Sequence, residues 1–157
     1  MKIFVLLPRI PWPLEKGDKL RAYNQIKQLS NDNEVVLCAL NTDKNANKEE
    51  AYKALQPYCI SVTFIDINKI SILFNIIKAF LKGLPIQCGY FYNSKAHKIV
   101  HNLIEKNKPD MLFGQLLRVA EYLRFEKTAK AIDYQDVFSM GMKRRADIAP
   151  FYLKPIF

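Results

Sequence analysis

Short apolar runs alternate along the chain with longer segments in which apolar residues recur every third or fourth position. The short runs have the length of buried strands, which we expect at residues 3–7, 34–40, 60–67, 111–113 and 129–133. The longer segments have helical periodicity, and we expect helices at residues 20–29, 48–55, 68–84, 94–107 and 116–125, the last after a turn at 114–115. Because strands that alternate with helices form parallel sheets, the pattern predicts an α/β fold: a Rossmann-like open parallel sheet with helices on both faces.

The helix expected over residues 94–107 follows an aromatic stretch, residues 90–92. These aromatic side chains either line a binding cleft or pack beneath a loop, and the sequence favours neither. Ser94 is the expected N-cap of the helix. The apolar face of the helix would include Ile99, Leu103 and Ile104.

The segment between the first strand and the first helix, residues 8–18, is rich in proline and carries Gly17 directly before the helix. It is longer than a plain connection needs to be, so we interpret it as a binding loop. Its backbone N–H groups would face an anion or a polar ligand. A lone glycine at such a place is also a common turn device, and both interpretations stay open here.

The last predicted strand brings a group of polar residues to the carboxyl edge of the sheet, the edge that also carries the first loop. They are Asp133, Tyr134, Gln135, Asp136 and Ser139. In open parallel sheets this is the edge where ligands bind. Asp133 and Asp136 therefore suggest a pair of catalytic or binding carboxylates, although Asp136 equally suits a helix cap.

The predicted helix of residues 70–84 is apolar except for a narrow stripe that includes Lys78 and Lys82. It is too short to span a bilayer. Its broad apolar face must cover either the sheet of its own domain or the headgroup region of a membrane, with the lysines at the rim. We favour packing on the sheet, and keep peripheral membrane contact as the alternative.

Basic residues outnumber acidic ones, 24 to 15, for a net charge of +9. A phosphate-bearing small molecule or an anionic membrane would account for this charge. Nucleic acid is the weakest of the candidate partners, because no motif that binds DNA or RNA accompanies the charge. The first residues lack the layout of a signal peptide, so we expect a cytoplasmic protein.

The cysteines and histidines do not suggest a metal site. Cys38, Cys59 and Cys88 are widely spaced and lie in or beside apolar segments, which is typical of buried thiols in a reducing compartment. His97 and His101 are four residues apart on a predicted helix, but no HExxH motif surrounds them and no cysteine is placed to join them. We therefore expect no metal and no cofactor.

Four segments in order resemble the N-terminal half of bacterial family 4 glycosyltransferases, enzymes of the GT-B fold that build surface polysaccharides. The segments are PRIPWPLEKGDKLRA, GLPIQCGYFYNSK, KPDMLFGQLLRVAEYL and AIDYQDVFSMGMKRRA. They correspond to the family's loop with proline and glycine, its small-Leu-Pro segment before an aromatic stretch, its Pro-Asp pair before a strand, and its Asp-x-x-Asp-x-x-Ser run. The likeness covers essentially the whole chain.

The resemblance implies a two-domain enzyme. Residues 1–140 would form the Rossmann-like N-terminal domain that holds a lipid-linked or saccharide acceptor. Residues 141–157 would lead toward a C-terminal domain that holds the nucleotide-sugar donor. The family transfers the sugar in the cleft between the domains, typically with retention and without a bound metal. The acidic pair of the family's donor domain has no counterpart here, so we expect this chain alone to be inactive.

The resemblance also suggests substrate-binding residues, and it identifies no catalytic residue. Gly17 and its neighbours Asp18 and Arg21 would approach the donor diphosphate. Four further residues would face the acceptor or the cleft: Gln115, Arg118, Asp133 and Asp136. Many members carry a histidine near the place of Gln115, so the hydrogen bond that such a histidine makes to the sugar is in doubt here.

Two alternatives belong to other functional classes. The first is a stand-alone Rossmann-like module that binds a nucleotide or a phosphate without catalysis. The chain has no G-x-G-x-x-G motif and no P-loop, which argues against it. The second is an interaction domain that has a basic face and no small-molecule ligand.

Overall fold

A computed structural model of the chain describes residues 1–67, 90–135, 141, 147–148 and 150. Five strands form a single sheet in the order β3-β2-β1-β4-β5, and every neighbouring pair is parallel. The strands are β1 (Lys2–Leu7), β2 (Glu34–Asn41), β3 (Ser61–Asp66), β4 (Met111–Gln115) and β5 (Lys130–Asp133). The predicted α/β class and parallel sheet are confirmed.

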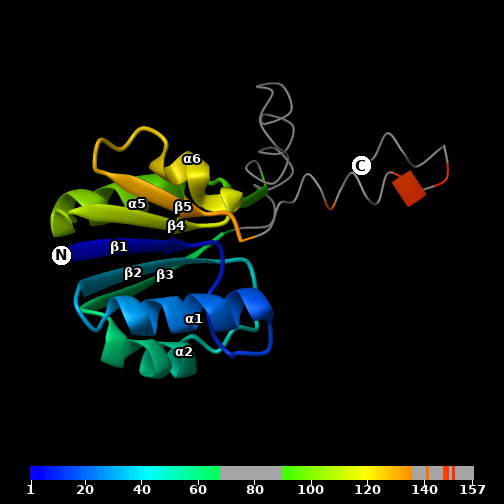
Figure 1. The fold of residues 1–157 in the computed structure, drawn as a ribbon, viewed down its shortest axis with the longest axis horizontal. Coiled ribbons are helices and arrows are strands. Elements are labelled where there is room, and N and C mark those ends of the chain that lie inside the picture. Colours follow the sequence, from blue (N-terminus) through cyan, green and yellow to red (C-terminus); the bar gives the residue numbers. More distant parts are fainter. Residues whose placement is uncertain (68–89, 136–140, 142–146, 149, 151–157) are drawn as a thin grey trace.

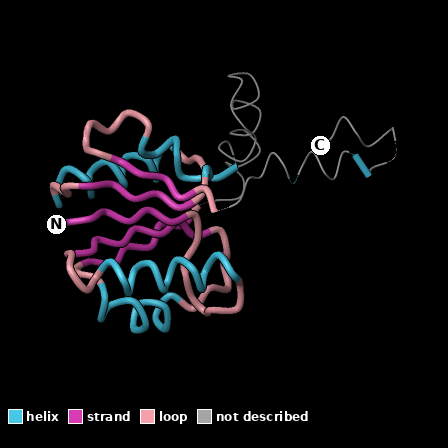
Figure 2. Tube along the Cα trace, in the orientation of Figure 1, coloured by secondary structure: helices cyan, strands magenta, loops and turns pink. Residues whose placement is uncertain are grey.

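Helices cover both faces of the sheet, as predicted (Figures 1 and 2). One face carries α1 (Gly17–Leu29) and α2 (Lys48–Leu55), which is followed by the 3₁₀ turn η1 (Gln56–Tyr58). The other face carries α5 (Ser94–Asn107), the 3₁₀ turn η2 (Leu117–Val119) and α6 (Ala120–Leu123). The helix predicted over residues 68–84, with its apolar face over 70–84, lies outside the described residues.

The apolar run of β1 contributes to two hydrophobic cores because its side chains alternate between the two faces. Ile3, Val5 and Leu7 belong to the core beneath α1 and α2. Phe4 and Leu6 belong to the core beneath α5 and α6. A central strand that is covered on both sides needs apolar residues at every position, which explains why its sequence shows no alternation.

The turn predicted at residues 114–115 is wrong, because both residues belong to β4. Gly114 continues the ladder and pairs with Leu6 of β1 and Ile132 of β5. A Cβ atom on Gly114 would lie 3.0 Å from Leu123 Cδ1 and 3.1 Å from Val119 Cγ2. The glycine therefore allows η2 and α6 to pack closely on the strand.

The continuous helix predicted over residues 116–125 is also wrong. Leu116 has a φ of 65°, which excludes it from a right-handed helix, and the chain then forms η2 before the short α6. The Leu116 N–H donates to the Asp133 carbonyl oxygen at 2.7 Å. This hydrogen bond extends the pairing of β4 with β5 by one residue and delays the start of the helix.

Helix α5 has its predicted bounds but a different cap and a rotated face. Its N-cap is Asn93, whose side chain accepts the N–H groups of the second and third residues that follow, at 3.0 Å each. Ile99 is 43% exposed, and the buried residues are Ala96, Val100 and Ile104. Their spacing of four follows the helical repeat, whereas Ile99 lies off that line. Ser94 and Ile99 were therefore misassigned.

Candidate functional site

The order of the strands identifies the edge where a ligand would bind. From β1 the chain moves outward to β2 and β3, and later enters β4 on the other side of β1. The carboxyl ends of β1 and β4 are therefore neighbours from which the chain leaves in opposite directions. Open α/β sheets bind their ligands in the crevice at such a switch point.

The loop after β1 is held against the helices that follow it. Ile10 is buried, and the Trp12 indole N–H donates to Glu50 Oε1 of α2 at 2.9 Å. Lys19 Nζ of α1 donates to the Trp12 carbonyl oxygen at 3.1 Å. The Trp12 ring also lies 5.9 Å, between centroids, from the ring of Tyr23. These contacts fix the loop as one wall of the switch point.

Two arginines and an aspartate form the first polar group of this site. Arg9 Nε lies 3.2 Å from Asp18 Oδ2. Gln115, only 2% exposed at the end of β4, donates from Nε2 to the Asp18 carbonyl oxygen at 3.4 Å. Burial lowers the pKa of Arg118, and the nearby charge of Arg9 lowers it further, while Asp18 opposes the shift. Asp18 thus offsets this accumulation of positive charge only in part.

An aromatic support holds Arg118 in position. Its guanidinium carbon lies 5.1 Å from the centroid of the Phe91 ring, within the range of a cation–π contact. The buried Tyr122 hydroxyl donates to the Phe91 carbonyl oxygen at 2.6 Å and accepts the Asn93 N–H at 2.9 Å. Of the predicted aromatic stretch, Phe91 is buried and Tyr90 is 38% exposed. Phe91, the middle residue of the stretch, therefore packs in the interior.

The second polar group is built around Asp133 at the end of β5. Its carboxylate forms an ion pair with Arg21 at 2.9 Å and accepts Gln25 Nε2 at 2.7 Å and the Gln135 N–H at 3.0 Å. Burial alone would raise the pKa of Asp133, but the two glutamine contacts and Arg21 together bring it below its usual value. Asp133 is therefore ionised at neutral pH, with its side chain 15% exposed.

Two polar atoms beside Asp133 are buried without a hydrogen-bond partner among the described residues. They are the side-chain oxygen Oε1 of Gln25 and the side-chain nitrogen Nε2 of Gln135. One is an acceptor and the other a donor. Burying such atoms unpaired costs free energy, so this corner of the site favours a polar partner for each.

The structure brings most of the predicted site residues to one edge. Asp18, Gln115 and Arg118 belong to the first polar group, and Arg21 is paired with Asp133 in the second. Gly17 begins α1 and is exposed, and a Cβ atom there would meet open space, so packing does not require a glycine. Asp136 lies outside the described residues.

The sequence alone missed three residues of the site. Arg9 follows Pro8 in the loop that was predicted to bind, and Gln25 lies one turn after Arg21 on α1, so position would have suggested both. Nothing in the sequence marks Tyr122 as the support of Phe91. This hydrogen bond joins residues 31 apart in the chain.

Of the two described cysteines, Cys38 is buried as predicted, whereas Cys59 is only partly buried. Burial raises the pKa of Cys38 and of Cys59 to about 12, so both remain protonated thiols. Cys88 lies outside the described residues.

One group of described side chains is close enough to share a metal ion: His101, Glu105 and Glu126. His97 is not part of it, and its Nδ1 contacts the Tyr92 hydroxyl at 3.2 Å.

No model of a known protein family matches the chain, and no curated protein matches it either. None of the helices in the described part of the chain has the length and apolar character needed to cross a membrane. The function of the chain is therefore inferred from the chemistry of the switch point and from the order of the sequence motifs.

Proposed function

We propose that this chain is the acceptor-binding domain of a glycosyltransferase that moves a sugar from a nucleotide-sugar donor to a lipid-linked or saccharide acceptor. The observation that carries the proposal is the gathering of arginine, aspartate and glutamine side chains at the switch point of a Rossmann-like sheet. The family-like segments are consistent with it, because three of the four supply most of these side chains.

The arginines and the aspartates of the two polar groups suit the two parts of a phosphorylated sugar ligand. Arg9 and Arg118 would bind a phosphate, for which planar guanidinium groups are well shaped. The carboxylates of Asp18 and Asp133 would accept hydrogen bonds from sugar hydroxyls. With Arg21, the described residues of the site include three arginines and two aspartates, so their net charge is positive and suits a phosphate.

In the reaction, the acceptor hydroxyl oxygen forms a bond to the anomeric carbon of the donor sugar and passes its proton to the departing diphosphate. The bond from that carbon to the nucleotide diphosphate breaks, and the diphosphate leaves with the electron pair. This domain would contribute by holding the acceptor in line, which is a major source of rate in such transfers. The donor would be held by a second domain, so the chain alone would be inactive.

Trp12 is the only tryptophan of the chain, and it lies in the loop that borders the site. We expect its fluorescence to change when a polyprenyl diphosphate-linked sugar in detergent binds. Arg118→Ala should weaken this binding roughly tenfold or more, as expected for loss of a charged hydrogen-bonding partner. Lys53→Ala, at an exposed pair on α2, is the matched control and should bind like the original chain.

Transfer itself is tested with the complete product of the gene, a panel of nucleotide sugars and a lipid extract. Incorporation of labelled sugar into the extract that Arg118→Ala reduces would support the proposal. Binding of free nucleotide or inorganic phosphate without any transfer would instead favour the stand-alone binding module. The Arg9 and Arg118 pair beside the start of α1 is the observation that makes this module the second candidate.

Cytoplasmic placement at the inner face of the membrane completes the proposal. Its support is the net charge of +9, which is suited to an anionic surface. Peripheral membrane contact through residues 70–84 also belongs to the proposal, and its support is the broad apolar face flanked by Lys78 and Lys82 that the sequence predicts. Those residues lie outside the described part of the chain.

A further inference from the structure

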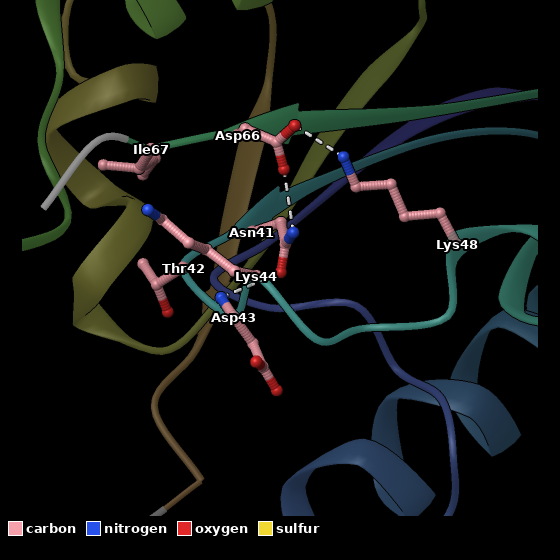
Figure 3. A pocket seen from close by; sticks show the side chains of 7 residues that line it. All are labelled: Asn41, Thr42, Asp43, Lys44, Lys48, Asp66 and Ile67. Atoms are coloured by element: carbon pink, nitrogen blue, oxygen red, sulfur yellow. Dashed lines mark hydrogen bonds and ion pairs between the residues drawn. The ribbon is translucent and has the colours of Figure 1, made fainter.

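A separate pocket lies at the carboxyl ends of β2 and β3 (Figure 3). Its volume of about 390 Å³ falls within the range of small-molecule sites. It opens at the same edge of the sheet as the switch point, and none of its residues belongs to the site described above. The lining residues are Asn41, Thr42, Asp43, Lys44, Lys48, Asp66 and Ile67.

The polar groups of this pocket are held in place by one another. Asn41 is only 5% exposed, and its Nδ2 donates to Asp66 Oδ1 at 2.8 Å. Asn41 Oδ1 accepts the Asp43 N–H at 3.0 Å, so both ends of the buried amide are used. Lys48 Nζ forms an ion pair with the other oxygen of Asp66. The Asp66 carboxylate is thus oriented from two sides, although its side chain is 64% exposed.

The charges of the pocket balance, in contrast to those of the switch point. Lys44 and Lys48 are matched by Asp43 and Asp66. Hydrogen bonds from Lys48 and Asn41 lower the pKa of Asp66, which is therefore an acceptor at neutral pH. A phosphate would gain from the ammonium groups and lose to the carboxylates, so an anion has no net electrostatic reason to bind.

The neighbouring hydroxyl groups of a sugar would suit this mixture of charges. A sugar hydroxyl donates one hydrogen bond and accepts others, so carboxylates and ammonium groups that lie side by side satisfy it in both roles. In Figure 3 the Lys44 side chain extends toward Ile67, which adds an apolar surface beside the polar groups. An apolar surface flanked by a few oriented polar groups is the usual make-up of a small-molecule site.

We propose that this pocket binds one neutral sugar unit, and that the acceptor is therefore an oligosaccharide that reaches from the switch point past β1 to the ends of β2 and β3. The part about the acceptor rests on the proposed function. Binding of a neutral sugar in the pocket does not rest on it.

The first test is a titration of the chain followed by amide NMR shifts. The probes are neutral monosaccharides at millimolar concentration, namely glucose, galactose, mannose, rhamnose, fucose and the two N-acetylhexosamines, with inorganic phosphate as the anionic probe. We expect at least one sugar to shift the amides of Asn41, Thr42 and Asp43, and phosphate to leave them unchanged. Phosphate binding in the pocket, or the absence of shifts there with every sugar, would overturn the proposal.

The second test compares two charge-removing variants. Asp66→Asn should weaken sugar binding roughly tenfold, because the pocket loses its oriented carboxylate. Glu49→Gln removes an equal charge from an exposed pair on α2 and should leave binding unchanged. Equal affinities for Asp66→Asn and the original chain would remove the pocket from sugar binding. A fold check by circular dichroism accompanies both variants.

The test separates this inference from the proposed function. Sugar binding in the pocket without transfer by the complete gene product would leave the pocket valid and the transferase proposal wrong. The complete gene product could instead transfer sugar equally fast to a monosaccharide and to an oligosaccharide acceptor, with no effect of Asp66→Asn. That result would overturn the oligosaccharide inference and leave the transferase proposal intact.

Discussion

At the scale of single residues, Asp133 shows how one carboxylate joins segments that are far apart in the chain. It lies at the end of β5, and its partners Arg21 and Gln25 lie more than a hundred positions earlier on α1. The resemblance to glycosyltransferases placed Arg21 on the donor side and Asp133 on the acceptor side. Their ion pair unites them in one group, so a ligand at this corner would meet both.

We expect Asp133→Asn to reduce stability at neutral pH by about 1–2 kcal/mol, since charge-assisted hydrogen bonds become neutral ones. The pKa of Asp133 is lower in the folded state than in the unfolded state, where it is about 3.9. Its stabilisation is therefore complete above that value and is lost as the pH falls through the folded-state pKa.

Urea unfolding at a series of pH values tests this expectation. The stability difference between the original chain and Asp133→Asn should shrink as the pH falls below about 4. The control is Asp32→Asn, at an exposed position before β2 on the opposite edge of the sheet, which should follow the original chain. A difference that stays constant down to low pH would contradict the assignment.

At the scale of elements, the close approach of η2 and α6 to β4 positions the arginine of the switch point. Gly114 leaves room for Val119 and Leu123, and Arg118 directly precedes Val119 on η2. The Tyr122 hydroxyl of α6 then holds the backbone that carries Phe91 beneath Arg118. The orientation of one side chain thus depends on the packing of two short helical turns.

Gly114→Ala should destabilise the fold by about 1–3 kcal/mol, because the new methyl group would lie within 3.1 Å of two buried side chains. Gly17→Ala is the matched control, since a Cβ atom there meets open space at the start of α1. It should be neutral or slightly stabilising. Thermal unfolding of both variants is the measurement, and equal melting temperatures for the two would show that β4 tolerates the added methyl group.

At the scale of the whole molecule, the same edge of the sheet carries two sites of different charge. The switch point has an excess of arginine, whereas the pocket at the ends of β2 and β3 is balanced. Because salt screens the attraction between exposed charges, the two sites should respond differently to ionic strength.

We expect pyrophosphate binding at the switch point to weaken several-fold when the salt concentration is raised from about 0.05 M to about 0.5 M. Binding of a neutral sugar in the pocket should change little over the same range. Both affinities are obtained from amide shifts in one sample, so each site serves as the control for the other. Equal salt dependence at the two sites would contradict the charge assignment.

Much of the fold was predictable, because strands and helices are encoded by local patterns. The apolar runs located all five strands to within two residues at each end, and α2 and α5 have their predicted bounds. The errors fall where tertiary contacts decided. Gly114 resembles a turn in the sequence, but in the structure it relieves crowding beneath α6. The positive φ of Leu116 divides a segment whose periodicity is helical throughout.

The order of the elements, the parallel sheet and the edge at which polar residues collect follow from the amino-acid sequence, because hydrophobic periodicity and chain connectivity are properties of neighbouring residues. Which polar side chains meet is set by the folded chain: Arg9 with Asp18, Arg21 with Asp133, and Asn41 with Asp66. Such pairs depend on the register of the strands and on the approach of the helices. These are set by packing over the whole domain, which no local pattern encodes.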